Sequence, residues 1–127
     1  MTGPYEELIE AYFRYRETDD ESLSWAWDQV DAEGFHDPIE KWRQILALLA
    51  AAPDDWQIGL LGAGPLEDLL RYHTAAVVDL VEAEVLTNAR LRLAIQHVWT
   101  RSSVSHRTDE ALARIDRLIA RVAEGPP

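Results

Sequence analysis

The stretch Leu60–His73, LLGAGPLEDLLRYH, decides how we expect this chain to fold. It joins an apolar run to a short helix through the turn sequence GAGP. Pro65 suits the first position of a helix, because its missing N–H would have no partner there. Gly64 can cap that helix, and Glu67 stands at the third helical position, where a carboxylate reaches back to the cap. We therefore predict that a new helix starts at Pro65.

The same stretch predicts a sharp corner between two helices. Gly62 can end the preceding helix in the left-handed conformation. Glu67 and Asp68 place negative charge at the positive end of the new helix, which stabilises it by about 0.3–1 kcal/mol each when exposed. A glycine-rich turn before a helix can also bind phosphate. Here no Lys-Ser/Thr pair follows and the two carboxylates would repel the anion, so we favour a structural corner.

Downstream of GxGPLEDLLxxH, whose histidine is His73, an acidic helix carries Glu82 and Glu84, and a further helix ends in Val-Trp at Trp99. Over residues 54–99 this arrangement resembles an uncharacterised bacterial family of small α-helical domains, a domain of unknown function. The resemblance implies a helical fold and no activity, because that family has none assigned. The N-terminal third and the last helix lie outside it.

Length and composition predict one ordinary globular domain. A chain of 127 residues buries about two-thirds of its unfolded surface, and 47% hydrophobic with 28% charged residues is typical of such domains. No run of 18 apolar residues is present, and the N-terminus lacks the pattern of a signal peptide. The chain has no cysteine, which excludes disulfides and thiolate chemistry. We expect a cytoplasmic protein with no membrane segment.

Negative charge is concentrated in the first half of the chain. Residues 1–56 hold 14 acids and 4 bases, net −10, whereas residues 57–127 hold 9 acids and 8 bases, net −1. Nucleic acid is a poor partner for the first half, because its phosphates must be neutralised by Lys or Arg. A basic protein would instead be attracted to it. We expect such a protein as partner, no nucleic acid and no membrane, and leave the oligomeric state open.

Hydrophobic periodicity predicts an all-α fold of seven or eight short helices packed as antiparallel hairpins. Helices are expected from Pro4, from Ser22, over Pro38–Ala52, from Asp54 or Asp55 to Leu61, from Pro65 to His73, over Ala75–Leu86, over Ala89–Thr100 and from Thr108. The single domain, 1–127, divides into acidic N-terminal helices (1–53), motif-bearing helices (54–100) and a C-terminal amphipathic helix (108–124). The apolar tail LALLAAA places the third helix at the centre. The expected core contains Trp27, Trp42, Leu46, Leu49, Leu61, Leu69, Val81, Ile95 and Trp99.

Four residues of the second helix are candidate partner contacts: Trp25, Asp28, Asp31 and Glu33. Trp25 points away from the apolar stripe of its helix. It therefore packs on a second internal surface or anchors a partner. Asp31 and Glu33 also fall within a segment, Gln29–Glu40, that resembles a calcium loop. Gln29 stands where such a loop needs Asp, so we reject calcium.

Glu84 lies inside the apolar arc of its helix, where a carboxylate must reach water or find a partner. We favour a structural ion pair with Arg90 or Arg92 over a position at the margin or a functional acid. His73 stands at a helix C-terminus, where the helix dipole accounts for it. A basic row in the last helix, Arg114, Arg117 and Arg121, could pack on the acidic half; we expect it to be solvated.

No sequence pattern typical of an active site is present. The histidines form no HExxH motif, the carboxylates lack Glu-x-x-His, and the serines lack a nucleophile elbow, so we expect no metal, cofactor or catalytic residue. Our hypothesis is a non-catalytic protein-binding module and, more specifically, an inhibitor or immunity-type partner of a basic protein. One alternative is a small enzyme or ligand-binding domain that uses Glu84, His73 and the Gly62–Pro65 turn. Another is a structural subunit of a homo-oligomer with a large apolar patch.

Overall fold

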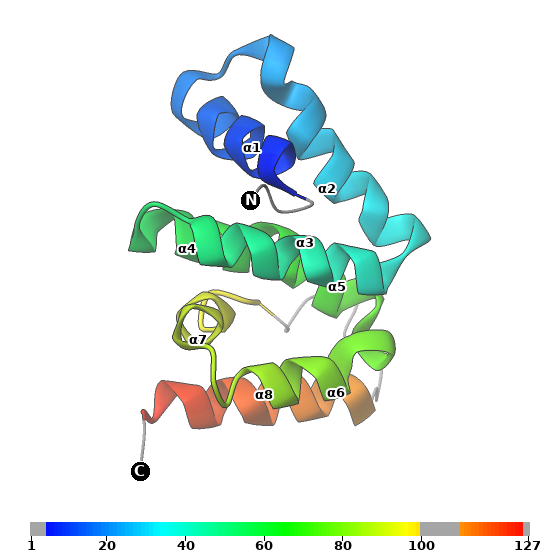
Figure 1. Ribbon diagram of the computed structural model, residues 1–127. Helices are drawn as coiled ribbons and strands as arrows, with labels where there is room; N and C mark the ends of the chain where they lie inside the picture. The colour runs from blue at the N-terminus through cyan, green and yellow to red at the C-terminus, as the bar shows by residue number, and fades with distance from the viewer. Residues whose placement is uncertain (1–4, 100–109, 126–127) are drawn as a thin grey trace.

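Helices form every regular element of the part of the chain that the computed structural model describes, residues 5–99 and 110–125. The side chains of residues 32–35 lie outside that description. The elements follow in chain order as α1 (Glu6–Thr18), the 3₁₀ turn η1 (Glu21–Leu23), α2 (Ser24–His36), α3 (Pro38–Ala51), α4 (Asp55–Leu61), the π-helical turn η2 (Gly62–Leu66), α5 (Glu67–Tyr72), α6 (Thr74–Glu84), α7 (Ala89–Ile95) and α8 (Glu110–Ala123). No strand occurs in these two ranges, and the predicted all-α fold is confirmed (Figure 1).

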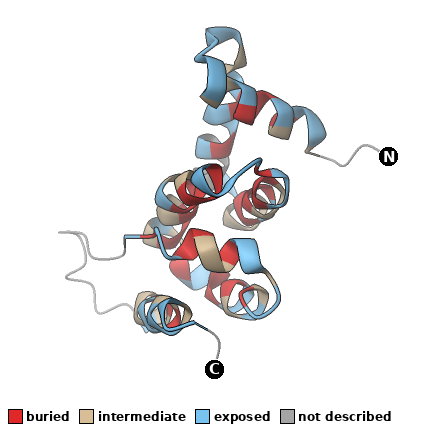
Figure 2. Cartoon of the chain, turned by 90° about the vertical axis from the view of Figure 1, so that its left-hand side faces the viewer, coloured by how far each residue is buried: buried red, intermediate tan, exposed pale blue. Residues whose placement is uncertain are grey.

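The helices stack in layers, with α3 in the middle (Figure 1). α1 and α2 lie on one side of α3, α6 and α7 lie on the other, and α8 packs against α6. Contacts join α3 to α1, α2, α4, α5, α6 and α7. Figure 2 shows buried residues where the layers face one another and exposed residues on the outer faces. The central position predicted for α3 is therefore confirmed.

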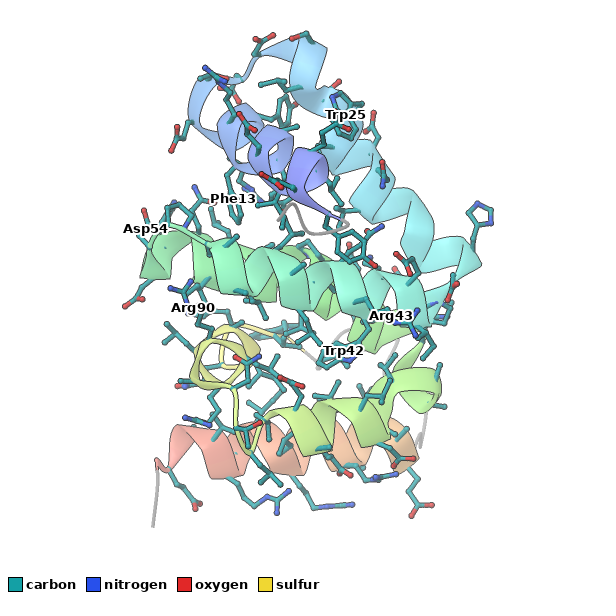
Figure 3. All side chains as sticks on the ribbon, in the orientation of Figure 1. Phe13, Trp25, Trp42, Arg43, Asp54 and Arg90 are labelled. Carbon is teal, nitrogen blue, oxygen red and sulfur yellow. The ribbon has the colours of Figure 1, made fainter. Side chains whose placement is uncertain are left out.

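The core fills the spaces on both sides of α3. Figure 3 shows Phe13 reaching from α1 toward the middle layer, and Trp42 reaching from α3 toward α6. Both side chains are buried, as are Leu49 of α3 and Ile95 of α7. Burial of each such side chain stabilises the fold by about 1.5–3 kcal/mol.

Three helices begin at side-chain caps. Asp37 accepts a hydrogen bond from the N–H of Glu40 at 3.1 Å, with Pro38 at the first helical position of α3. Asp54 accepts one from Gln57 N–H at 2.8 Å and begins α4. Asn88 caps α7 in the same way. Each cap satisfies an N–H that the helix itself leaves unpaired.

The predicted corner at Gly62–Pro65 is wrong, because the chain stays helical from α4 through η2 into α5. Gly62 is right-handed, with φ −65° and ψ −46°, so it is not a left-handed cap, and Gly64 is not an N-cap. Pro65 has no N–H and its ring clashes with the carbonyl four residues earlier in a regular α-helix. The wider π turn accommodates it, and the N–H of Glu67 donates to the Gly62 carbonyl, five residues back.

Gly62 is required for a different reason, the close approach of α7. A Cβ added to Gly62 would stand 2.0 Å from the carbonyl oxygen of Ala94, and both residues are buried. A Cβ added to Gly64 would meet nothing within 4 Å. The two glycines of the motif therefore differ in what they contribute: one sets a helix–helix distance, and the other faces open space.

The predicted core was wrong for two tryptophans. Trp27 is 38% exposed, because α1 and α2 form a layer only one helix deep, and its ring lies flat on Tyr12. Trp99 is 64% exposed. The helix expected to reach Thr100 ends at Ile95, so the apolar stripe that would have buried Trp99 stops before it. Leu46 is half-buried, and the other expected core residues are buried.

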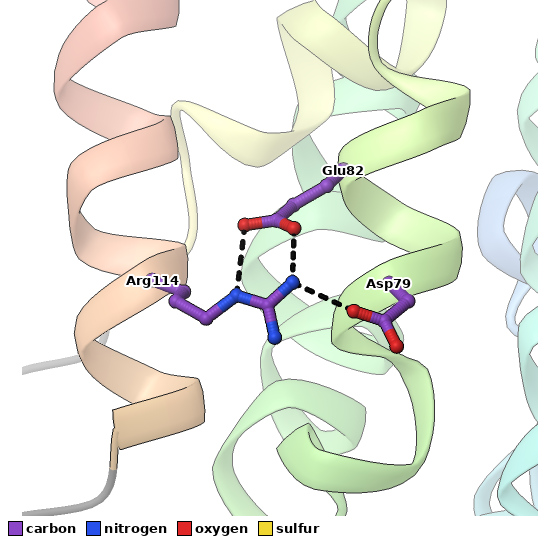
Figure 4. Close-up of polar contacts among 3 residues, drawn as sticks. All are labelled: Asp79, Glu82 and Arg114. Carbon is purple, nitrogen blue, oxygen red and sulfur yellow. Dashed lines mark hydrogen bonds and ion pairs between the residues drawn. The ribbon is translucent and has the colours of Figure 1, made fainter.

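An arginine clamp holds α8 to α6 (Figure 4). Arg114 donates from Nε to Glu82 at 3.1 Å, from Nη2 to the same carboxylate, and from Nη2 to Asp79 at 2.6 Å. Ile115 and Leu118 are buried beside it. The expectation that Arg114 is solvated is therefore wrong, since the sequence does not reveal that α6 lies within reach. Hydrogen bonding from Arg114 lowers the pKa of the Glu82 carboxyl below its ordinary value.

Replacing Gly62 by Ala is expected to lower the free energy of unfolding by about 1–3 kcal/mol or more, because the Cβ must displace the α7 backbone. Gly64→Ala is the matched control. Gly64 has no positive φ and open space around it, so this change is expected to be neutral or to stabilise by up to about 1 kcal/mol. Urea denaturation measures both. Equal stability of the two variants would contradict the assigned role of Gly62.

Arg114→Gln is expected to lower the amide-exchange protection of α8, because it removes the ion pairs to α6. Arg117→Gln removes the same charge from an exposed position of α8 and serves as control. The carboxylate of Glu82 contributes stability above its ordinary pKa, and this contribution is lost as pH falls through its lowered folded-state value. Protection of α8 in the wild type should fall in that acidic range, and the fall should be absent in Arg114→Gln. Identical profiles would show that apolar contacts alone hold α8.

Candidate partner-binding surface and lysine pocket

The outer layer, α1 to α2, presents an acidic surface that we call the hairpin surface. All nine acids described between residues 5 and 31 are exposed: Glu6, Glu7, Glu10, Glu17, Asp19, Asp20, Glu21, Asp28 and Asp31. Local geometry helps to place them. Asp19 ends α1 in the left-handed conformation with φ 53°, and Asp20 caps η1 by accepting from Ser22. Hydrogen bonding from Ser22 lowers the pKa of the Asp20 carboxyl below its ordinary value.

The two bases of this layer are engaged within it. Arg14 lies 3.9 Å from Glu10 in an exposed pair. Arg16 stacks its guanidinium 4.5 Å from the ring centre of Trp27, and it donates to the Tyr12 hydroxyl at 3.4 Å. Burial raises the pKa of Tyr12, although Arg16 partly counteracts it. The hairpin surface therefore keeps a large excess of exposed negative charge.

The four predicted partner contacts do not all lie on one surface. Trp25, labelled in Figure 3, is 43% exposed, and Asp28 one helical turn later is also exposed. Their spacing of three residues places them on neighbouring positions of α2. Asp31 instead lines a pocket beneath the hairpin, described next. Glu33 belongs to α2, but its side chain lies outside the described residues.

That pocket surrounds Lys41 of α3, at the junction of the outer and middle layers. It is a cavity of about 40 Å³, lined by Tyr12, Trp27, Val30, Asp31, Lys41, Gly64, Pro65 and Asp68. The motif residues Gly64, Pro65 and Asp68 thus meet Asp31 from α2. A space of this size holds one or a few water-sized molecules.

Sequence reasoning missed Lys41, which is 2% exposed. Burial lowers the pKa of its ammonium, and the negative charges of Asp68 and then Asp31 partly oppose this. Within the described part of the chain the ammonium group of Lys41 makes no direct hydrogen bond or ion pair. One signal was available: eleven of the 12 bases are Arg, and Lys41 is the only lysine.

The remaining motif residues hold helix ends together. Glu67 accepts a hydrogen bond from the backbone N–H of Trp99 at 2.6 Å and lies 3.9 Å from Arg71. It therefore ties α5 to the segment after α7, and the predicted capping role of its side chain is wrong. His73 is half-buried between α5 and α6, and its backbone N–H donates to the carbonyl of Leu69.

Glu84 has a different partner from the one predicted. It accepts from the Asn88 side chain at 3.0 Å. Arg90, labelled in Figure 3, donates to the carbonyls of Leu49 and Ala52 at 2.9 and 2.8 Å. Arg92 donates to the Val85 carbonyl at 2.9 Å. The predicted ion pair is therefore wrong for the described residues, because both arginines satisfy carbonyls that helix C-termini leave unpaired.

The parts of the proposed small-ligand site do not meet. His73 and Glu84 stand at opposite ends of α6, about 16 Å apart along an axis that rises 1.5 Å per residue. Gly62 packs on α7, whereas Gly64 and Pro65 line the Lys41 pocket. The described residues contain no group of three or more His, Cys, Asp or Glu side chains placed to hold a metal ion.

A second hollow is an open groove of about 1040 Å³ between the α6–α7 turn and the second half of α8. Its apolar walls include Val85, Leu86, Leu93, Leu118 and Val122. Arg92 and Arg121 also line it. Leu86 is 77% exposed and extends these apolar walls onto the surface. No helix in residues 5–99 or 110–125 is long and apolar enough to cross a membrane.

Comparison with known proteins gives one match. A family model described as a family of unknown function (DUF6869) matches residues 14–123. No curated protein and no solved structure matches the chain. The match extends beyond the predicted range 54–99 to include the end of α1 and all of α2 and α8. It supports the resemblance at the level of an uncharacterised family, and the chain belongs to this family of unknown function, DUF6869.

Proposed function

We propose that this protein is a non-catalytic module that binds a basic protein through the hairpin surface. The observation that supports it is the exposure of all nine described acids of residues 5–31 beside two engaged arginines. Such a field accelerates encounter with a cationic surface and disfavours polyanions. The effect falls with salt, because the Debye length is about 8 Å at physiological ionic strength.

Trp25 would supply the apolar contact that charge alone does not. Interfaces concentrate their binding energy in a few residues, and Trp is over-represented among them. Trp25 stands half-exposed beside Asp28 and makes no ring contact or hydrogen bond within the described residues. An aromatic side chain that is flanked by carboxylates suits a partner that presents Lys or Arg around an apolar patch.

Within this proposal, an inhibitor or immunity-type role is the more specific form. An inhibitor that covers a basic surface prevents that surface from binding its own ligand. Such inhibition requires no catalytic residue in the inhibitor. This role is compatible with the described part of the chain, in which Glu84 and His73 stand at opposite ends of α6 and do not share a pocket.

The test is affinity capture from the native host at low salt, with the chain immobilised. The double reversal Glu17→Lys and Asp28→Lys changes two exposed hairpin acids that cap no helix and pair with no base among the described residues. Glu110→Lys with Glu124→Lys changes two exposed acids of the α8 region by the same charge. The partner captured by wild type should be lost with the hairpin variant, retained by the control and released by salt.

Trp25→Ala in the same assay is expected to weaken binding by at least about tenfold, the scale of a moderate interface anchor. Trp56→Ala, which removes an exposed Trp of α4, should leave it unchanged. Equal capture by all these variants would refute binding through the hairpin surface.

The open groove between α6, α7 and α8 favours a second candidate, a structural subunit of a homo-oligomer. Its apolar walls and exposed Leu86 are what a subunit contact requires. Sedimentation at micromolar concentration separates the two functions. A dimer that Leu86→Glu dissociates would support the structural subunit, and a monomer at all concentrations would eliminate it.

A further inference from the structure

Lys41 stands out because the chain uses arginine everywhere else. Eleven of the 12 bases are Arg, and the single Lys is the only base that is buried among the described residues. An arginine keeps its charge in every protein environment, whereas a buried lysine readily loses its proton. The one position that retains lysine is therefore the one at which a neutral base is attainable.

The surroundings of Lys41 leave its amine available. The described residues give it no hydrogen bond or ion pair, and it borders the cavity of about 40 Å³. Tyr12 and Trp27 form the aromatic side of that cavity, and Asp31 and Asp68 are the two carboxylates beside it. Asp31 is exposed and Trp27 is partly exposed, so the cavity reaches the surface at its α2 side.

The structure assigns Lys41 as a covalent binding site for a small neutral aldehyde of one to three carbons, held as an imine. A cavity of about 40 Å³ favours a molecule of that size over a larger one. Asp31 and Asp68 disfavour an anionic carbonyl compound through like-charge repulsion. Desolvation of an amine in an apolar pocket is a known way to make lysine nucleophilic.

The reaction is a condensation that needs no oxidant or reductant. The lone pair of Nζ attacks the carbonyl carbon, and the former carbonyl oxygen becomes the hydroxyl of a carbinolamine. A carboxylate, Asp31 or Asp68, carries two protons in turn from the nitrogen to that oxygen: the first forms the hydroxyl, and the second lets it leave as water. The product is a C=N bond, and its protonated form is a cation that the two carboxylates stabilise.

The test uses acetaldehyde with cyanoborohydride, which reduces the imine and fixes the label, followed by peptide mass spectrometry. Because Lys41 is the only lysine, the sole other primary amine is the N-terminus, which serves as an internal reference. At neutral pH we expect Lys41 to be labelled at least threefold faster in the folded protein than in urea. Burial lowers the pKa of this amine, and each pKa unit gives about tenfold more neutral amine.

Two further measurements keep the proposal falsifiable. Asp68→Asn should slow labelling of Lys41 severalfold without changing the N-terminal rate, whereas Asp116→Asn on α8 should change neither. Benzaldehyde and glyoxylate, one too large and one anionic, should label the N-terminus but not Lys41 in the folded chain. Labelling of Lys41 only in urea, or equal labelling by all three carbonyl compounds, would overturn the assignment.

Discussion

The burial of α3 is the constraint on which the rest of the structure depends. Its buried residues include Trp42 and Leu49, and they lie on more than one side, so helices must cover it on both faces. α1 and α2 supply one cover, and α6 and α7 supply the other. Because the outer cover is only one helix deep, its far side cannot be buried. That leaves an acidic face on one end of the molecule and exposes part of Trp27.

The second constraint is the distance between η2 and α7. A glycine at 62 lets the Ala94 carbonyl approach to a separation that no side chain permits. Pro65 widens the same turn into a π-helix, which carries Gly64 and Asp68 under α2. The motif therefore joins two layers: one part of it sets the packing on α7, and the next part completes the environment of Lys41.

These two constraints place one candidate functional feature on the outer face of the α1–α2 layer and the other beneath that layer. The hairpin surface owes its charge to residues that a thin layer must leave in water. The pKa of Lys41 is lowered because the side chain is buried where α3 meets the outer layer. An exposed surface for a partner and a buried amine for a small molecule are independent, because they use different residues apart from the pocket edge at Asp31.

The sequence by itself determined the all-α class, the helix starts at Pro38 and at Asp54 or Asp55, the central place of α3 and the acidic first half. These depend on local spacing, capping chemistry and composition, which operate within a few residues. Tertiary structure alone decided that Gly62 meets Ala94, that Arg114 binds α6, that Arg90 caps α3 and that Lys41 is buried. Each of these contacts joins residues at least 32 positions apart, or depends on several helices at once. A side chain's partner is fixed only when the helices have packed, so no local pattern could have named it.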